Sequence, residues 1–154
     1  MAKEKAVRRH LRRGGSERGA ALLEMALTLP LLLLVCVGIL EFGRAYQAWQ
    51  VLTNAAREGA RIAVLPGTSD AAVQSRVQTY LTAGQLPNAG SASVAINRNQ
   101  SISIGTGTAS ASEVTVNYPF DFIVLDPIAR LATGTGSLTP STLNMVASAT
   151  MRNE

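Results

Sequence analysis

Apolar residues dominate one continuous segment near the start of the chain, from Ala20 to Leu40. The segment has 21 residues and is interrupted only by Glu24, Thr28, Pro30 and Gly38. A helix of this length measures about 30 Å at about 1.5 Å per residue, which matches the hydrocarbon core of a bilayer. The pattern therefore predicts a transmembrane helix.

Three kinds of segment share this pattern: a cleaved secretory signal, an uncleaved anchor, and a segment that is cut on its cytoplasmic side. A secretory signal has a shorter apolar stretch, followed by a small-x-small cleavage site in a polar segment. Here residues 41–46 continue directly into a helical pattern, which disfavours removal of the whole segment. The other two alternatives remain open on this pattern.

The helical pattern continues beyond the apolar segment. Apolar side chains recur there at steps of three and four residues, which places them on one stripe of a helix. The stripe consists of Phe42, Ala45, Tyr46, Trp49, Leu52, Ala56, Ala60 and Ala63. Pro66 and Gly67 then stop the helix. One helix is predicted from Ala20 to about Leu65, with residues 41–65 as an amphipathic extension of the transmembrane segment.

Residues 66–154 are predicted to form a small exported α+β domain. A helix is expected from Asp70, as its N-cap, to about Gly84. Alternation of β-branched and polar residues predicts strands at 93–97, 101–104 and 113–118, the last ended by Pro119, and a further strand at 143–151. Residues 120–131 are expected to form a loop with a short helix. The predicted fold class is α+β, with a long N-terminal stalk helix followed by one helix and an antiparallel sheet.

Charge is concentrated in residues 1–19, which carry seven basic and two acidic side chains, a net charge of +5. The rest of the chain sums to −1. By the positive-inside rule, this basic leader lies in the cytoplasm and the part after the span lies outside. The basic character therefore indicates topology and contact with acidic lipid, and argues against nucleic-acid binding.

Glu24 is the most informative residue, because it places a carboxylate inside the apolar segment. A charge costs about 2.5 to 3.5 kcal/mol at the centre of a span and less near its end. Such residues usually have a partner and a function. The alternative is a glutamate that reaches the inner interface without a partner.

Four spaced blocks of the sequence resemble the TadE-like minor pseudopilins of the tight-adherence (Tad/Flp-type IVb) pilus system. The blocks are residues 19–24, 29–33, 39–44 and 54–61, and the resemblance covers roughly residues 14–65. The motif residues on the helical extension are Glu41, Phe42, Gly43, Arg44, Asn54, Arg57, Glu58, Gly59 and Arg61. The resemblance implies a pilin-like helix in the bacterial inner membrane.

The resemblance also implies processing by a prepilin peptidase on the cytoplasmic side, between Gly19 and Ala20. Glu24 matches the glutamate that follows the cut, whereas Met25 replaces the usual aromatic residue. Partners implied by the resemblance are this peptidase, other pilin and pseudopilin subunits, and the inner-membrane assembly platform.

Leader removal would create an α-amino group at Ala20, one helical turn from Glu24. At about 4 Å and an effective dielectric constant near 20, their attraction is roughly 4 kcal/mol before desolvation. We expect this pair to guide the packing and axial register of subunits.

Residue types that support catalysis are sparse. The one histidine, His10, lies in the leader, and the one cysteine, Cys36, lies in the apolar segment, so no His-based triad or His/Cys metal cluster is expected outside. Glu113, Asp121 and Asp126 are interpreted as surface acids. The Gly/Thr-rich turns at 105–108 and 134–137 lack the context of phosphate-binding loops. No cofactor and no enzymatic activity are expected.

Three classes of function follow from the sequence. The favoured one is a pilin-like subunit processed after Gly19 and placed in a pilus or its assembly platform. The alternative is an uncleaved single-pass anchor that displays a binding module outside the cytoplasm. A membrane-tethered enzyme is the least favoured.

Overall fold

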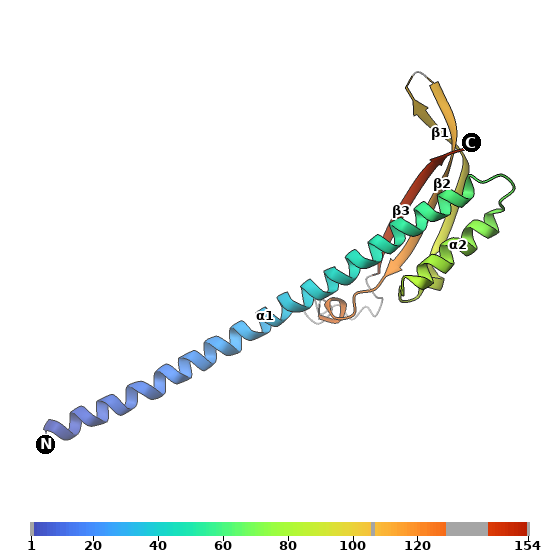
Figure 1. The fold of residues 1–154 in the computed structure, drawn as a ribbon. Helices are drawn as coiled ribbons and strands as arrows, with labels where there is room; N and C mark the ends of the chain where they lie inside the picture. Colours follow the sequence, from blue (N-terminus) through green and yellow to red (C-terminus); the bar gives the residue numbers. More distant parts are fainter. Residues whose placement is uncertain (1, 106, 129–141, 154) are drawn as a thin grey trace. The chain divides into compact units, whose positions relative to one another are not determined.

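The computed structural model describes residues 2–105, 107–128 and 142–153, with side chains from residue 19 onwards. Its elements are α1 (Ala2–Ala63), α2 (Asp70–Ala83), the 3-10 helix η1 (Ala89–Ser91), β1 (Ser93–Ile104), β2 (Gly107–Phe120) and β3 (Leu143–Arg152) (Figure 1). The long N-terminal helix, the second helix and the antiparallel sheet confirm the predicted fold class. The chain divides into two compact units, Met1–Leu40 and Glu41–Glu154.

In the first unit the helix exposes its apolar side chains. Every residue from Gly19 to Cys36 is exposed, and α1 continues through Pro30 without a break. The segment Gly19–Ala63 is long and apolar enough to cross a membrane. A run of exposed leucines suits a helix that is surrounded by lipid, where helices satisfy their own backbone hydrogen bonds. The segment is therefore compatible with a single-pass membrane anchor.

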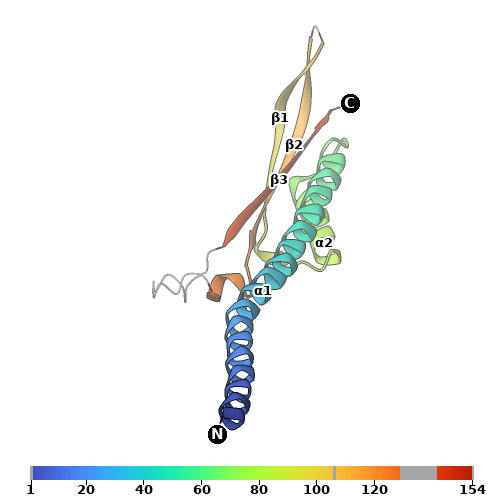
Figure 2. The same ribbon diagram turned by 90° about the vertical axis from the view of Figure 1, so that its left-hand side faces the viewer.

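The second unit contains an antiparallel sheet in the order β1-β2-β3 (Figure 2). Val114, Val116, Tyr118 and Phe120 are buried at alternate positions of β2, and the residues between them are only half-buried. Because successive side chains of a strand point to opposite faces, one face of the sheet is covered. This face is covered by the second half of α1, residues 41–63, and by α2.

Small residues of α1 form much of the core of this unit. Ala48, Leu52, Ala55, Ala56, Ala60 and Ala63 are buried there together with Val73, Val77 and Leu81 of α2. The predicted stripe is correct for Leu52 and for three of these alanines. Tyr46 and Trp49 of the stripe are 66% and 44% exposed, because the contact with the rest of the unit is made by the neighbouring face of α1, which carries alanines.

The strands differ from the predicted ones in extent. The segments predicted at 93–97 and 101–104 form one strand, β1, whose register against β2 shifts between Asn97 and Gln100. β2 begins at Gly107, where the small Ala and Ser residues gave no strand signal, because pairing with β1 extends it. Pro119 lies inside β2, at a position paired only with β3, where its missing N–H is tolerated.

The structure corrects the predicted N-cap of α2 and confirms a short helix after β2. Ser69, not Asp70, is the N-cap of α2, because its Oγ accepts a hydrogen bond from the backbone N–H of Ala72 at 3.3 Å. Residues 125–128 are helical, within the segment where a short helix was expected. Residues 129–131 of that segment and the turn at 134–137 lie outside the described residues.

Gly59 allows α1 to approach both α2 and β2 closely. A Cβ atom added to Gly59 would lie 2.6 Å from Cγ2 of Val77 and 3.1 Å from Cγ1 of Val114. The first distance is shorter than any real contact of this kind, so a side chain would have to move. In contrast, a Cβ atom added to Gly43, also on α1, would meet no atom within 4 Å.

We predict that Gly59→Ala destabilises the second unit by about 1–3 kcal/mol, because overpacking outweighs the gain of up to about 1 kcal/mol in helix propensity. Gly43→Ala is the matched control and should be neutral or stabilising. Thermal unfolding of the full chain in detergent, followed by circular dichroism, measures both effects. Adding Val77→Ala to Gly59→Ala should recover part of the loss, and a Gly59→Ala chain as stable as the Gly43→Ala chain would contradict the packing argument.

Candidate functional site

Glu41, the first motif residue of the helical extension, is a buried carboxylate that is 4% exposed. Its Oε1 accepts a hydrogen bond from Nη1 of Arg44 at 3.2 Å, and its Oε2 accepts one from the backbone N–H of Ile123 at 3.0 Å. Buried carboxylates are tolerated when such charge-assisted hydrogen bonds satisfy them. Glu41 therefore attaches the start of the folded half of α1 to the segment that follows β2.

Arg44 and Phe42 extend this attachment through aromatic contacts. The guanidinium carbon of Arg44 lies 5.4 Å from the ring centroid of Phe120. Phe122 packs edge to face on both Phe120 and Phe42, with centroids 5.2 and 6.5 Å away. Cation–π and edge-to-face pairs each contribute about 0.5–1.5 kcal/mol. The block at 41–44 thus acts as one contact surface for residues 120–123.

The second motif block, at 54–61, has a mixed role. Nε and Nη2 of Arg76 on α2 donate to Oε1 of Glu58 at 3.2 and 2.8 Å, so Glu58 joins the two helices. Asn54, Arg57 and Arg61 are exposed. In this block Glu58, Gly59 and the buried residues Ala55, Ala56 and Ala60 therefore have structural roles, and the exposed residues remain available to other molecules.

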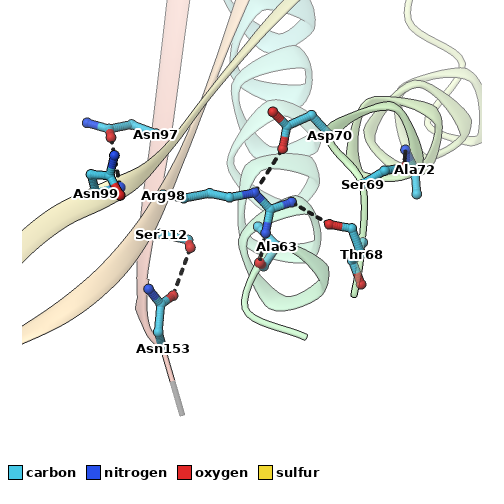
Figure 3. A network of polar contacts seen from close by, with 10 residues as sticks. All are labelled: Ala63, Thr68, Ser69, Asp70, Ala72, Asn97, Arg98, Asn99, Ser112 and Asn153. Atoms are coloured by element: carbon cyan, nitrogen blue, oxygen red, sulfur yellow. Dashed lines mark hydrogen bonds and ion pairs between the residues drawn. The ribbon is translucent and has the colours of Figure 1, made fainter. Parts of the chain in front are cut away.

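The structure shows a network around Arg98 that the sequence analysis missed (Figure 3). Nη1 of Arg98 donates to the carbonyl of Ala63 at the end of α1, Nη2 donates to the carbonyl of Thr68, and Nε donates to Oδ1 of Asp70 at 2.8 Å. The last carbonyls of a helix lack helical partners and favour a cation. Arg98 thereby connects the end of α1, the start of α2 and the irregular part of β1.

One sequence signal for Arg98 was present. It occupies an inward position in the alternation of β1, two residues after Ile96, where an apolar residue would be expected. A charged residue at such a position needs partners. The identity of those partners depends on the tertiary structure, because Ala63 lies 35 residues away.

The predicted processing and assembly residues lie on the first unit. Gly19, Ala20 and Glu24 are exposed on α1, and a Cβ atom added to Gly19 would meet no atom within 4 Å. Positions 20 and 24 are one helical turn apart, as expected. The structure joins Glu24 to no other described residue. The roles of these three residues therefore stay predictions.

The remaining candidate residues are the cysteine and the acidic side chains of the described part of the chain. It holds no group of three or more His, Cys, Asp or Glu residues that is suited to a metal ion. Cys36 is a free, exposed cysteine on α1. Asp121 is exposed, whereas Glu113 and Asp126 are partly buried.

The part of α1 that carries the processing and motif residues matches a family of known proteins. Residues 19–61 match the family model described as TadE-like protein. This segment is TadE-like. The match begins at Gly19 and ends at Arg61, so it contains the predicted processing site and all of the motif residues. It confirms the resemblance found in the sequence and supports a pilin-like protein associated with a Tad pilus system. No curated protein and no solved structure matches the chain.

We predict that Glu41→Ala destabilises the second unit by about 2–4 kcal/mol, since it leaves the N–H of Ile123 and the guanidinium of Arg44 without their acceptor. Glu58→Ala is the matched control: it removes a more exposed ion pair of the TadE-like helix and should cost about 1 kcal/mol or less. Urea unfolding of the full chain measures both. Limited proteolysis should cut residues 121–128 faster in Glu41→Ala only, and equal effects of the two substitutions would contradict the role given to Glu41.

Tyr118 provides a test of the core by pH. It is 2% exposed, its hydroxyl donates to the carbonyl of Pro87, and burial raises its pKa, with Asp121 adding to the rise and Arg44 opposing it. Because the pKa is higher in the folded state, the stability that Tyr118 contributes is present below about pH 10 and is lost as the pH rises through the folded-state value.

We predict that Tyr118→Phe lowers the free energy of unfolding by about 1 kcal/mol at pH 7, through loss of the hydrogen bond. It should also make the decline in stability above about pH 10 shallower than in the wild-type chain. Urea unfolding at a series of pH values checks both effects. Parallel pH profiles for the two chains would show that Tyr118 does not titrate with a raised pKa.

Proposed function

We propose that the chain is a pilin-like structural or assembly subunit, a TadE-like minor pseudopilin, of a Tad/Flp-type pilus or secretion system. A prepilin peptidase would process it after Gly19. The observation that carries the proposal is the family match over residues 19–61, which starts at the proposed cleavage site. The proposal assigns no catalytic activity and no cofactor to the chain.

The electrostatics of the N-terminal region support this proposal. Cleavage after Gly19 would remove seven basic side chains and leave one α-amino group at Ala20. Glu24 is exposed on the helix one turn later, so its carboxylate is available to this amino group on the same or a neighbouring helix. Pairing would offset much of the cost of placing each charge at the edge of the bilayer. Leader removal would thereby convert an anchored precursor into a subunit that packs against similar helices.

The proposed location is the bacterial inner membrane. The chain would cross it once, with its N-terminus in the cytoplasm and the unit Glu41–Glu154 outside, as the basic leader indicates. Its partners would be the peptidase, other pilin and pseudopilin subunits, the assembly platform and lipid.

Mass spectrometry of the protein from native envelopes tests the processing step. We expect a mature chain that begins at Ala20. Gly19→Leu should abolish this product, because the enlarged side chain disrupts the recognised position, while exposure at Gly19 leaves the helix intact. Native protein that retains its leader would overturn the proposal and favour the uncleaved anchor.

Substitution of Glu24 tests the assembly step. Glu24→Ala and Glu24→Gln should leave cleavage at Gly19 at the wild-type level but reduce incorporation into pili or platform complexes by about tenfold, since both remove the negative charge. Met25→Ala, at the neighbouring exposed position, is the control and should assemble normally. Normal incorporation of Glu24→Ala would exclude the proposed role of the carboxylate.

A further inference from the structure

The charges of the second unit are not all matched within the unit. Three of its carboxylates are paired with arginines: Glu41 with Arg44, Glu58 with Arg76, and Asp70 with Arg98. Among the described residues, the structure places no ion pair or hydrogen bond on the side chains of Arg57, Arg61, Arg152, Glu113 and Asp121. Arg61 and Arg152 lie at one end of the unit, and Asp121 lies at the other. Glu113 pairs with Thr150, two residues before Arg152.

The cationic place is a depression of about 510 Å³ where the end of α1 meets the end of β3. Arg61 and Arg152 line it together with Val64, Leu65, Pro66 and Met151. Leu65 is 53% exposed. Arg61 in the last turn of α1 also complements the helix dipole, but this does not account for Arg152, which comes from the sheet.

Two arginines that line a depression with an apolar wall favour a ligand of defined chemistry. Guanidinium groups bind carboxylates through paired hydrogen bonds. The apolar wall excludes water and favours a branched aliphatic side chain next to the carboxylate. The depression therefore fits an acidic residue that is close in sequence to an exposed aliphatic residue.

The opposite end of the same unit presents such a pair. Asp121 is exposed, and Ile123 is 63% exposed. The backbone N–H of Ile123 is held by the buried carboxylate of Glu41, which fixes the segment in place. Ordering of this segment therefore adds little entropic cost to binding.

Asp121 cannot reach the depression of its own chain. In the ladder of β2 and β3, Phe120 pairs with Leu143 and Ala111 pairs with Arg152. Nine residues separate these rungs on β2, or about 30 Å at 3.3 Å per residue. The two complementary surfaces thus lie at opposite ends of one unit.

We propose that the depression at Arg61 and Arg152 binds the segment of Asp121 and Ile123 from a second copy of this chain, in a head-to-tail contact. Each copy then retains one free surface of each kind, so the contact repeats and adds subunits in one direction. This inference rests on the proposed function, because the contact would join copies of a subunit that assembles.

Directed cross-linking in the full chain tests the contact. In a Cys36→Ala background, one chain carries Leu65→Cys in the depression and a differently tagged chain carries Ile123→Cys. After mixing in detergent micelles, a short bismaleimide should join the two kinds of chain and should not join either kind to itself. Gln74→Cys, at an exposed position of α2, replaces Leu65→Cys as the control and should give no product.

Reversing the charges of Asp121 or of Arg61 and Arg152 tests whether electrostatic attraction holds the contact together. Asp121→Lys in the Ile123→Cys chain, or Arg61→Glu with Arg152→Glu in the Leu65→Cys chain, should reduce the cross-linked fraction by about tenfold or more. Combining the two altered chains should restore it. Thr79→Lys in the Ile123→Cys chain adds a positive charge at an exposed position of α2 and should have no effect. Added salt should weaken the wild-type contact.

Each outcome either supports or overturns the contact. Cross-links only between identical Cys variants would show a symmetric contact and overturn the head-to-tail contact. A tenfold loss of cross-linking that the combined charge reversals do not restore would also overturn it. A mature chain beginning at Ala20 that gives no cross-link would refute this inference and leave the proposed function standing. An uncleaved chain that still cross-links head to tail would do the reverse.

Discussion

The close packing of the second half of α1 on α2 and β2 is the contact on which the folded unit depends. Its buried surface is built mainly from alanines, together with the fully buried Leu52, and Gly59 lies at the closest approach. Small side chains bury little area each, so α1 gains stability by close packing all along residues 48–63. This requirement explains why the aromatic residues Tyr46 and Trp49 are on the outside, although they repeat at helical spacing.

Polar contacts fix the two ends of this packed half. Glu41 holds the backbone of Ile123 at its start, and Arg98 donates to the carbonyl of Ala63 at its end. Each contact satisfies a group that would be costly to bury alone. Together they set where α1 enters and leaves the unit, a position that packing of alanines alone would leave poorly defined.

The same helix carries both the TadE-like match and the core of the folded unit. Within the matched segment 19–61, Glu41, Glu58 and Gly59 have structural roles, whereas Glu24, Arg57 and Arg61 are exposed without a described partner. The motif therefore combines residues that build the folded unit with residues that are available to other molecules. An assembling subunit requires both kinds, because its contacts must form on a surface that folding has already made rigid.

The sequence by itself determined the long helix, the stop at Pro66 and Gly67, the α+β class and the TadE-like motif. These features rest on local patterns: a run of apolar residues, periodic spacing, and breakers such as Gly and Pro. The tertiary structure alone decided which face of α1 is buried, that β1 is one strand, and which groups Glu41 and Arg98 contact. The tertiary partners of Glu41 and Arg98 lie 28 to 82 residues away, and no local pattern in a chain specifies which distant group will meet a charged side chain.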